Sequence, residues 1–187
     1  QEIQTQGFSG TVITSGTVTA TYPNNGALAG QPSYVIQNGS GANSAIWVIG
    51  SGVAEGDLVE VAGSVSEVFG LRQIQSAVPT ILSSGNALPD AEVLDPSAIN
   101  SQDWECVLVQ MEGTASGITA SFGEWNLSDG TGQGMVASLG YNAVNDSVIG
   151  HDGTPMALVE LDRNYRVTGP NFYSFGNWKV CPRDTVD

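Results

Sequence analysis

Three residues in the second half of the chain carry side chains suited to acid, base or metal chemistry. Asp146, His151 and Asp152 supply two carboxylates and the only imidazole of the sequence, groups that transfer protons or hold a metal ion. The polarity of a surface loop explains them more simply. There is also no nucleophile elbow, phosphate-binding Walker loop or zinc signature. We therefore predict a chain that is not an enzyme and that needs no metal and no cofactor.

Two glycine-rich segments could cradle a phosphate or bind calcium. They read Asn-Gly-Ser-Gly at 38–41 and Asp-Gly-Thr-Gly at 129–132. Both stand at the same place between two stretches with strand-like composition, which favours hairpin turns over ligand loops.

A binding surface for nucleic acid or glycan would use the basic and aromatic residues of the second half. Aromatic rings stack on bases or sugars, and cations contact phosphates. The alternative is that these aromatic rings are buried in the small hydrophobic core. The charge also opposes this function, because 19 acidic residues against 5 basic ones give a net charge of -14, which repels phosphate backbones. The candidate residues are Arg163, Arg166, Tyr173, Trp178, Lys179 and Arg183.

Cys106 and Cys181 lie near the two ends of the second half. We expect them to form a disulfide that closes a loop of about 75 residues and stabilises the fold by about 4 kcal/mol; the alternative is two buried thiols. The bridge, the scarcity of lysine and a first residue that is not Met indicate a mature secreted protein. Candidate glycosylation sequons occur at Asn38, Asn126 and Asn145.

One pattern occurs twice along the chain. Residues 56–63 followed by Phe69-Gly70 return as 163–169 followed by Phe175-Gly176. This predicts two copies of one small β-unit.

The predicted units are a first domain at 1–82, a Pro- and Ser-containing linker at 83–103 and a second domain at 104–187. We expect at most a short helix in the linker, beginning near Asp95-Pro96. The glycine-rich turns are 91 positions apart but the later strands are 106 apart, so we expect an inserted loop near 142–155 in the second domain.

The segment 56–71, with its Gly-Asp-Leu-Val and Phe-Gly-Leu motifs, resembles the OB-fold domain that precedes the catalytic domain of secreted bacterial nucleases of the endonuclease/exonuclease/phosphatase superfamily. The second unit resembles another copy of that module. The resemblance implies an all-β fold of two tandem small OB-like barrels and a secreted location. It does not imply activity, because such nucleases carry their metal-binding carboxylates and catalytic histidines on a separate large domain.

Two functions follow as hypotheses. The first is an extracellular structural subunit of a fibre or surface coat, which binds other copies of itself or a surface component through free strand edges and through an extended N-terminus at 1–8. The second is an accessory module of a secreted nuclease that binds nucleic acid or glycan. No segment is apolar for long enough to span a membrane.

Overall fold

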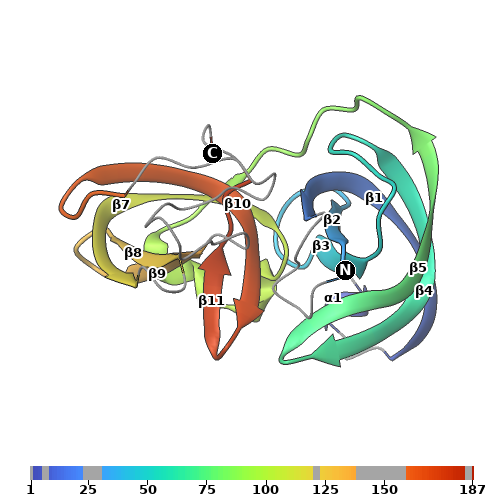
Figure 1. Ribbon diagram of the computed structural model, residues 1–187, viewed down its shortest axis with the longest axis horizontal. Helices are drawn as coiled ribbons and strands as arrows, with labels where there is room; N and C mark the ends of the chain where they lie inside the picture. The colour runs from blue at the N-terminus through green and yellow to red at the C-terminus, as the bar shows by residue number, and fades with distance from the viewer. Residues whose placement is uncertain (1, 6–8, 23–30, 120–122, 138–158, 184–186) are drawn as a thin grey trace.

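The computed structural model describes residues 2–5, 9–22, 31–119, 123–137, 159–183 and 187. Almost all regular structure in them is β-strand, arranged in two units that lie side by side (Figure 1). The predicted fold class, two tandem OB-like β-barrels, is confirmed. None of the described helices is long and apolar enough to cross a membrane. The loop predicted near 142–155 lies outside the described residues.

The first unit is a closed barrel with the strand order β1-β2-β3-β5-β4. Only β3 and β5 run parallel; the other neighbours are antiparallel. Branched aliphatic side chains fill its interior, among them Val18, Ile36, Val59 and Ile74. The strands are β1 (Gly10–Tyr22), β2 (Ser33–Gln37), β3 (Ala45–Ile49), β4 (Leu58–Val68) and β5 (Leu71–Ser83).

The second unit repeats this topology. Its strands follow the order β7-β8-β9-β11-β10, and β10 pairs back onto β7. Among these five strands the parallel pair is β9 with β11, which occupies the place of β3 with β5. The strands are β7 (Leu108–Thr119), β8 (Glu124–Ser128), β9 (Gln133–Ala137), β10 (Asn164–Ser174) and β11 (Asn177–Val180).

Two glycines at matching register positions show which strands of the two repeats correspond. Gly63 on β4 is opposite Val12 on β1, and Gly169 on β10 is opposite Val109 on β7. A Cβ built on Gly169 would lie 2.1 Å from a backbone oxygen, and one on Gly63 would lie 2.7 Å from another. Only glycine allows the neighbouring chain to approach so closely. The predicted repeat of residues 56–63 at 163–169 therefore has a steric basis, since each copy ends in one of these glycines.

The segment between the barrels is ordered against both of them. It contains β6 (Glu92–Val93), which pairs with β7, and the 3-10 turns η1 (Pro96–Ile99) and η2 (Gln102–Trp104). The helical turn expected near Asp95-Pro96 is present as η1, but the Asp95 side chain makes no capping hydrogen bond. The Glu92 side chain accepts a hydrogen bond from the Gly41 backbone at 2.6 Å. The segment thus bridges the two units.

One apolar cluster, separate from the cluster inside the first barrel, joins the two barrels. Trp47 is fully buried, stacks on Tyr22 with ring centroids 5.0 Å apart, and lies 6.2 Å from the ring of Phe172 in the second unit. These rings belong to one cluster that continues into the interior of the second barrel. Large shared apolar interfaces of this kind couple domains.

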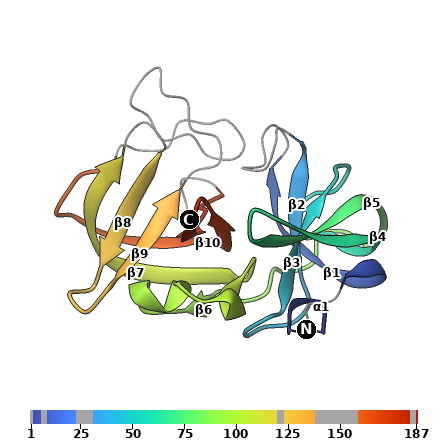
Figure 2. The same cartoon turned by 90° about the horizontal axis from the view of Figure 1, so that it is seen from below.

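The predicted extended N-terminus is wrong for the residues that are described. Residues 2–5 form one helical turn, α1 (Glu2–Thr5), which lies against the first barrel (Figure 2). Arg72 donates from Nη1 to the backbone oxygens of Ile3 and Gln4, at 2.8 and 2.6 Å. The side chain of Gln4 donates to Ala45 O. These bonds fix the turn to the barrel and prevent it from pairing as a strand.

The predicted disulfide is also wrong. Cys106 and Cys181 are both buried, and neither forms a disulfide. Cys106 N donates to Asn171 O on one side of β10, whereas Cys181 N donates to Pro170 O on the other side. At the usual strand spacing this places the two residues about 10 Å apart, beyond the roughly 7 Å that a disulfide spans. Burial raises the pKa of the Cys106 thiol well above its ordinary value.

Candidate interaction surface

The hairpin formed by the last two strands of each repeat ends in the same unusual way. Phe69-Gly70 joins β4 to β5, and Phe175-Gly176 joins β10 to β11. The φ angles are 52° and 86° in the first turn and 50° and 82° in the second. Positive φ at both positions is the pattern of a type I′ turn, which favours Asn-Gly. Phenylalanine there costs about 1–2 kcal/mol because its Cβ crowds the backbone.

Both phenylalanine rings also face solvent. Phe69 is 79% exposed and Phe175 is 88% exposed. Each repeat therefore bears a strained backbone and an unburied aromatic ring at the same position. Strain that neither packing nor burial offsets is a feature of functional sites. We call Phe69 and Phe175 the aromatic tips.

The ends of the two hairpins that carry the aromatic tips lie close together. A Cβ built on Gly70 would lie 2.6 Å from a ring atom of Tyr173 on β10. Tyr173 in turn packs against Trp178 on β11, with ring centroids 4.9 Å apart. Figures 1 and 2 both show the end of the β4–β5 hairpin beside the end of the β10–β11 hairpin. The tips and the half-buried pair thus form one aromatic surface contributed by both barrels.

The charges around this surface are neutralised in pairs. Lys179 is 2% exposed, pairs with Glu124 and holds its Nζ 5.6 Å from the centroid of Phe175. Such a cation also attracts the face of the ring. Arg72 pairs with Glu67 on the other hairpin. The surface is therefore apolar and carries little net charge.

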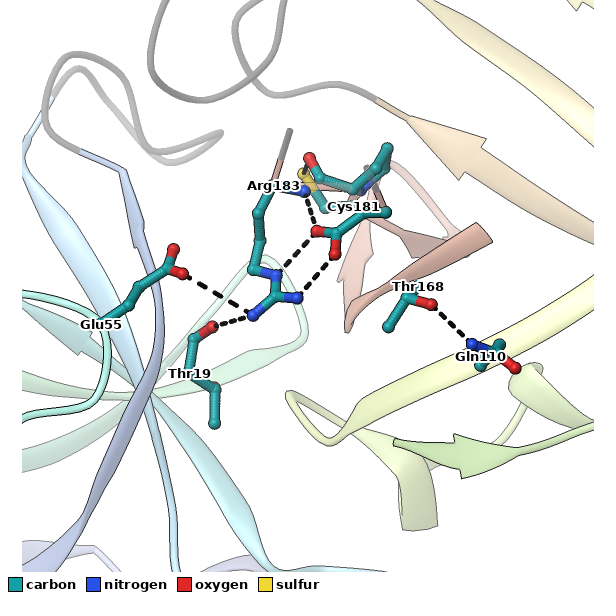
Figure 3. A network of polar contacts seen from close by, with 8 residues as sticks. Thr19, Glu55, Gln110, Thr168, Cys181 and Arg183 are labelled. Carbon is teal, nitrogen blue, oxygen red and sulfur yellow. Dashed lines mark hydrogen bonds and ion pairs between the residues drawn. The ribbon is translucent and has the colours of Figure 1, made fainter. Parts of the chain in front are cut away.

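Arg183 acts between the barrels and is not displayed to a ligand. Its guanidinium pairs with Asp187 at 2.6 Å, donates to Thr19 O at 3.1 Å and lies 3.7 Å from Glu55 (Figure 3). Thr19 and Glu55 belong to the first unit, so this network ties the end of the chain to the first barrel.

The structure separates the six residues predicted to bind a ligand. Tyr173, Trp178 and Lys179 lie together at the aromatic surface, with the Lys179 charge engaged by Glu124. Arg163 and Arg166 are exposed farther along β10, where Arg163 pairs with Glu160. The aromatic tips were not among the residues predicted from the sequence. Their signal was present as a bulky residue before glycine in the duplicated Phe-Gly motif.

The glycine-rich segments are hairpin turns, as predicted. They connect β2 to β3 and β8 to β9. Asp129 Oδ1 accepts hydrogen bonds from Thr131 N, Thr131 Oγ1 and Gly132 N, and the bonds to Thr131 hold the pKa of its carboxyl below the usual range. The loop satisfies this carboxylate itself. Within the described part of the chain, no group of carboxylate, His and Cys side chains is arranged to hold a metal ion.

The predicted modification sites differ in access. Asn38 is exposed in the β2–β3 turn, whereas Asn126 is half-buried on β8. Asn145, and the candidate acid-base residues Asp146, His151 and Asp152, lie outside the described residues. Use of the sequons stays a prediction.

Comparison with known proteins gives no family. No protein-family model and no curated protein sequence matches the chain. A murine DNA-binding protein bound to double-stranded DNA has a TM-score of 0.46 and 12% identity over 91% of this chain and 93% of that one. A structure described as structural mimicry for functional antagonism has a TM-score of 0.46 and 10% identity over 93% of this chain and 90% of that one. The HINa domain of Ifi202 in complex with 20-bp double-stranded DNA has a TM-score of 0.43 and 9% identity over 93% of each chain.

Likeness this distant says nothing about what the chain binds. The resemblance to domains of secreted bacterial nucleases also stays a prediction.

Proposed function

We propose that this chain is a non-catalytic extracellular structural subunit that binds other copies of itself in a fibre or surface coat. The observation that carries the proposal is the pair of aromatic tips. Each tip keeps a strained phenylalanine exposed at a turn where asparagine would cost less. Aromatic residues, phenylalanine among them, are enriched in the buried cores of protein–protein interfaces relative to the rest of the surface.

Charge supports a protein partner over nucleic acid. The chain has a net charge of -14. Three of its five basic residues, Arg72, Lys179 and Arg183, are largely buried in contacts within the fold. A duplex would meet mainly acidic side chains, and the attraction on which phosphate binding depends is missing.

The same charge restricts where two copies can meet. Surfaces rich in Asp and Glu repel each other, whereas the aromatic tips are apolar and flanked by neutralised pairs. Contact through the tips therefore has a low electrostatic cost. An extracellular location remains part of the proposal, although the unformed disulfide removes one of the reasons for it.

The test replaces both tips with asparagine, as Phe69→Asn/Phe175→Asn. We expect sedimentation velocity and electron microscopy to show concentration-dependent assemblies for the natural chain and a large loss of assembly for the variant. Thermal stability should rise, because Asn-Gly suits the turn. Val93→Thr is the matched control, since Val93 is 77% exposed on β6 and lies outside the tips. Only monomers at every concentration of the natural chain would overturn the proposal.

The second function predicted from the sequence, nucleic-acid or glycan binding, would use stacking on the same rings. Fluorescence anisotropy with single-stranded DNA at low salt tests its nucleic-acid form. We expect no binding up to high micromolar protein. Saturable binding that the asparagine variant abolishes would support this second function.

A further inference from the structure

A second apolar surface lies on the first barrel, on the side away from the second unit. Ile13 on β1 is opposite Ala62 on β4, and Ala62 is opposite Val78 on β5. Ile13 is 72% exposed, Val78 is 71% exposed and Ala62 is also exposed. We call these three residues the outer apolar row. Figure 1 places their strands at the far end of the first barrel.

The strand at the edge of this row, β5, carries no charged residue after Arg72. Residues 73–89, which include most of β5, contain no Asp, Glu, Lys or Arg. In a chain with a net charge of -14, an uncharged run beside exposed apolar side chains is a place where another acidic copy can approach with little repulsion.

Backbone pairing is blocked at this edge. β3 pairs with β5 only at Gln73 and Ile74, so in the described part of the chain no strand pairs with residues 78–83 on the side away from β4. Pro79, opposite Val61, has no N–H and cannot donate to an added strand. Proline at a strand edge is a common protection against strand addition. A partner must therefore dock on the side chains of the row.

We infer that the aromatic tips of one copy dock on the outer apolar row of the next copy. This inference rests on the proposed function, since it names the contact that joins the copies. The tips project from two hairpin ends, whereas the row lies on a sheet face elsewhere on the molecule. When two unlike surfaces form the contact, the molecule at one end of the assembly still has free tips and the molecule at the other end has a free row. Further copies can therefore add, and the assembly grows as an open filament unless the rotation between neighbouring copies closes it into a ring.

Packing of one row against another is less favourable because of Glu60. This residue is exposed on β4 between Ser15 and Thr80, in the register position next to the outer apolar row. A two-fold contact between rows would bring both copies of Glu60 into one interface, and like charges in an interface oppose association. The tips carry no such charge, because the cations and anions around them are paired.

The experiment uses two variants of the full chain, each lacking one surface. The tip variant is Phe69→Asn/Phe175→Asn. The row variant is Ile13→Gln/Ala62→Thr/Val78→Thr, which changes only exposed side chains. Circular dichroism confirms that both fold. Each is analysed alone and mixed in equal amounts by sedimentation velocity, with the natural chain alongside.

We expect each variant alone to remain monomeric and the mixture to form heterodimers that grow no further, because each dimer has a single tip-to-row contact. A row variant that still dimerises, or a mixture that stays monomeric while the natural chain assembles, would overturn this inference and leave self-association standing. A natural chain that never assembles would overturn the proposed function itself.

Discussion

The two barrels share their topology but differ on the outer face formed by the first and fourth strands. In the first barrel, Ile13 on β1 is opposite Ala62 on β4. At the equivalent position of the second barrel, Gln110 on β7 is opposite Thr168 on β10, and their side chains hydrogen-bond at 2.9 Å (Figure 3). The next pair on this face of the second barrel, Glu112 and Arg166, is exposed and of opposite charge, and the pair beyond it, Thr114 and Asn164, hydrogen-bonds at 2.7 Å.

The difference shows which positions the barrel geometry constrains. The glycines at strand contacts are kept in both repeats because close backbone approach requires them. The phenylalanines of the two Phe-Gly turns are also kept, although the turn geometry favours asparagine at that position. The outward positions are free to differ. The second barrel has a polar face on which Gln110 bonds to Thr168 and Thr114 bonds to Asn164. The first barrel has one row of exposed apolar side chains at the corresponding level.

The fifth strand differs as well. β5 runs from Leu71 to Ser83, whereas β11 ends at Val180 after only four residues. Beyond the end of β11, Thr168 N donates instead to the backbone oxygen of Asp187 at 2.8 Å. The extra length of β5 is the part that carries Val78 and the proline-protected edge.

The largest predicted effect concerns the core that the barrels share. Trp47→Ala should lower the free energy of unfolding by about 3–5 kcal/mol, because it removes a fully buried ring between the units. Calorimetry of the natural chain should show one cooperative transition. Two separate transitions would mean that the barrels are independent. Val93→Ala, an exposed apolar change, is the control.

The next effect depends on pH. Glu105 is fully buried between the barrels, where its Oε1 accepts from Arg72 N at 2.9 Å. Burial raises its pKa to about 7, and the bond from Arg72 N and the Arg72 charge only partly offset this. In the unfolded chain the acid ionises at lower pH, so stability should fall as pH rises from about 4.5 to above 7. The loss is about 3 kcal/mol.

The variant Glu105→Gln tests this assignment. It should remove most of the dependence of the melting temperature on pH between 5 and 8. Glu112→Gln alters an exposed carboxylate on β7 and should leave the dependence unchanged. An unaltered pH profile for Glu105→Gln would assign the dependence to other groups.

A smaller effect, opposite in sign, is expected at the turns. Phe69→Asn and Phe175→Asn should each raise the free energy of unfolding by about 1 kcal/mol, because asparagine accepts the left-handed backbone more readily. Chemical denaturation of the two single variants measures this. A loss of stability in either would show that its ring packs in the folded chain and that its exposure is not available to a partner.

The smallest change in folding stability is expected for exchanges on the outer faces of the two barrels. Exchanging the pair in the first barrel, as Ile13→Gln/Ala62→Thr, should change stability by less than about 0.5 kcal/mol while weakening self-association. The reverse exchange, Gln110→Ile/Thr168→Ala, should leave the second barrel folded and give it a new apolar face. Sedimentation of both variants would show whether the difference between the faces controls assembly.

The duplication and strand content were predictable because they depend on local patterns. The glycine-rich turns and the glycine of the repeated Phe-Gly motif each reflect a short-range steric requirement. The turns at 38–41 and 129–132 followed for the same reason. The candidate binding residues were less predictable, since Lys179 and Arg183 are basic in the sequence but engaged by acids in the fold.

The sequence by itself determined that this chain forms two β-units of one design with a strongly acidic composition, because residue periodicity, turn residues and charge are local properties. Only the tertiary structure decided three further points: β10 lies between the two cysteines, Trp47 is enclosed by both units, and the two hairpin ends that carry the exposed phenylalanines meet at Gly70 and Tyr173. Each depends on which distant strands become neighbours, and the packing of the whole chain sets that.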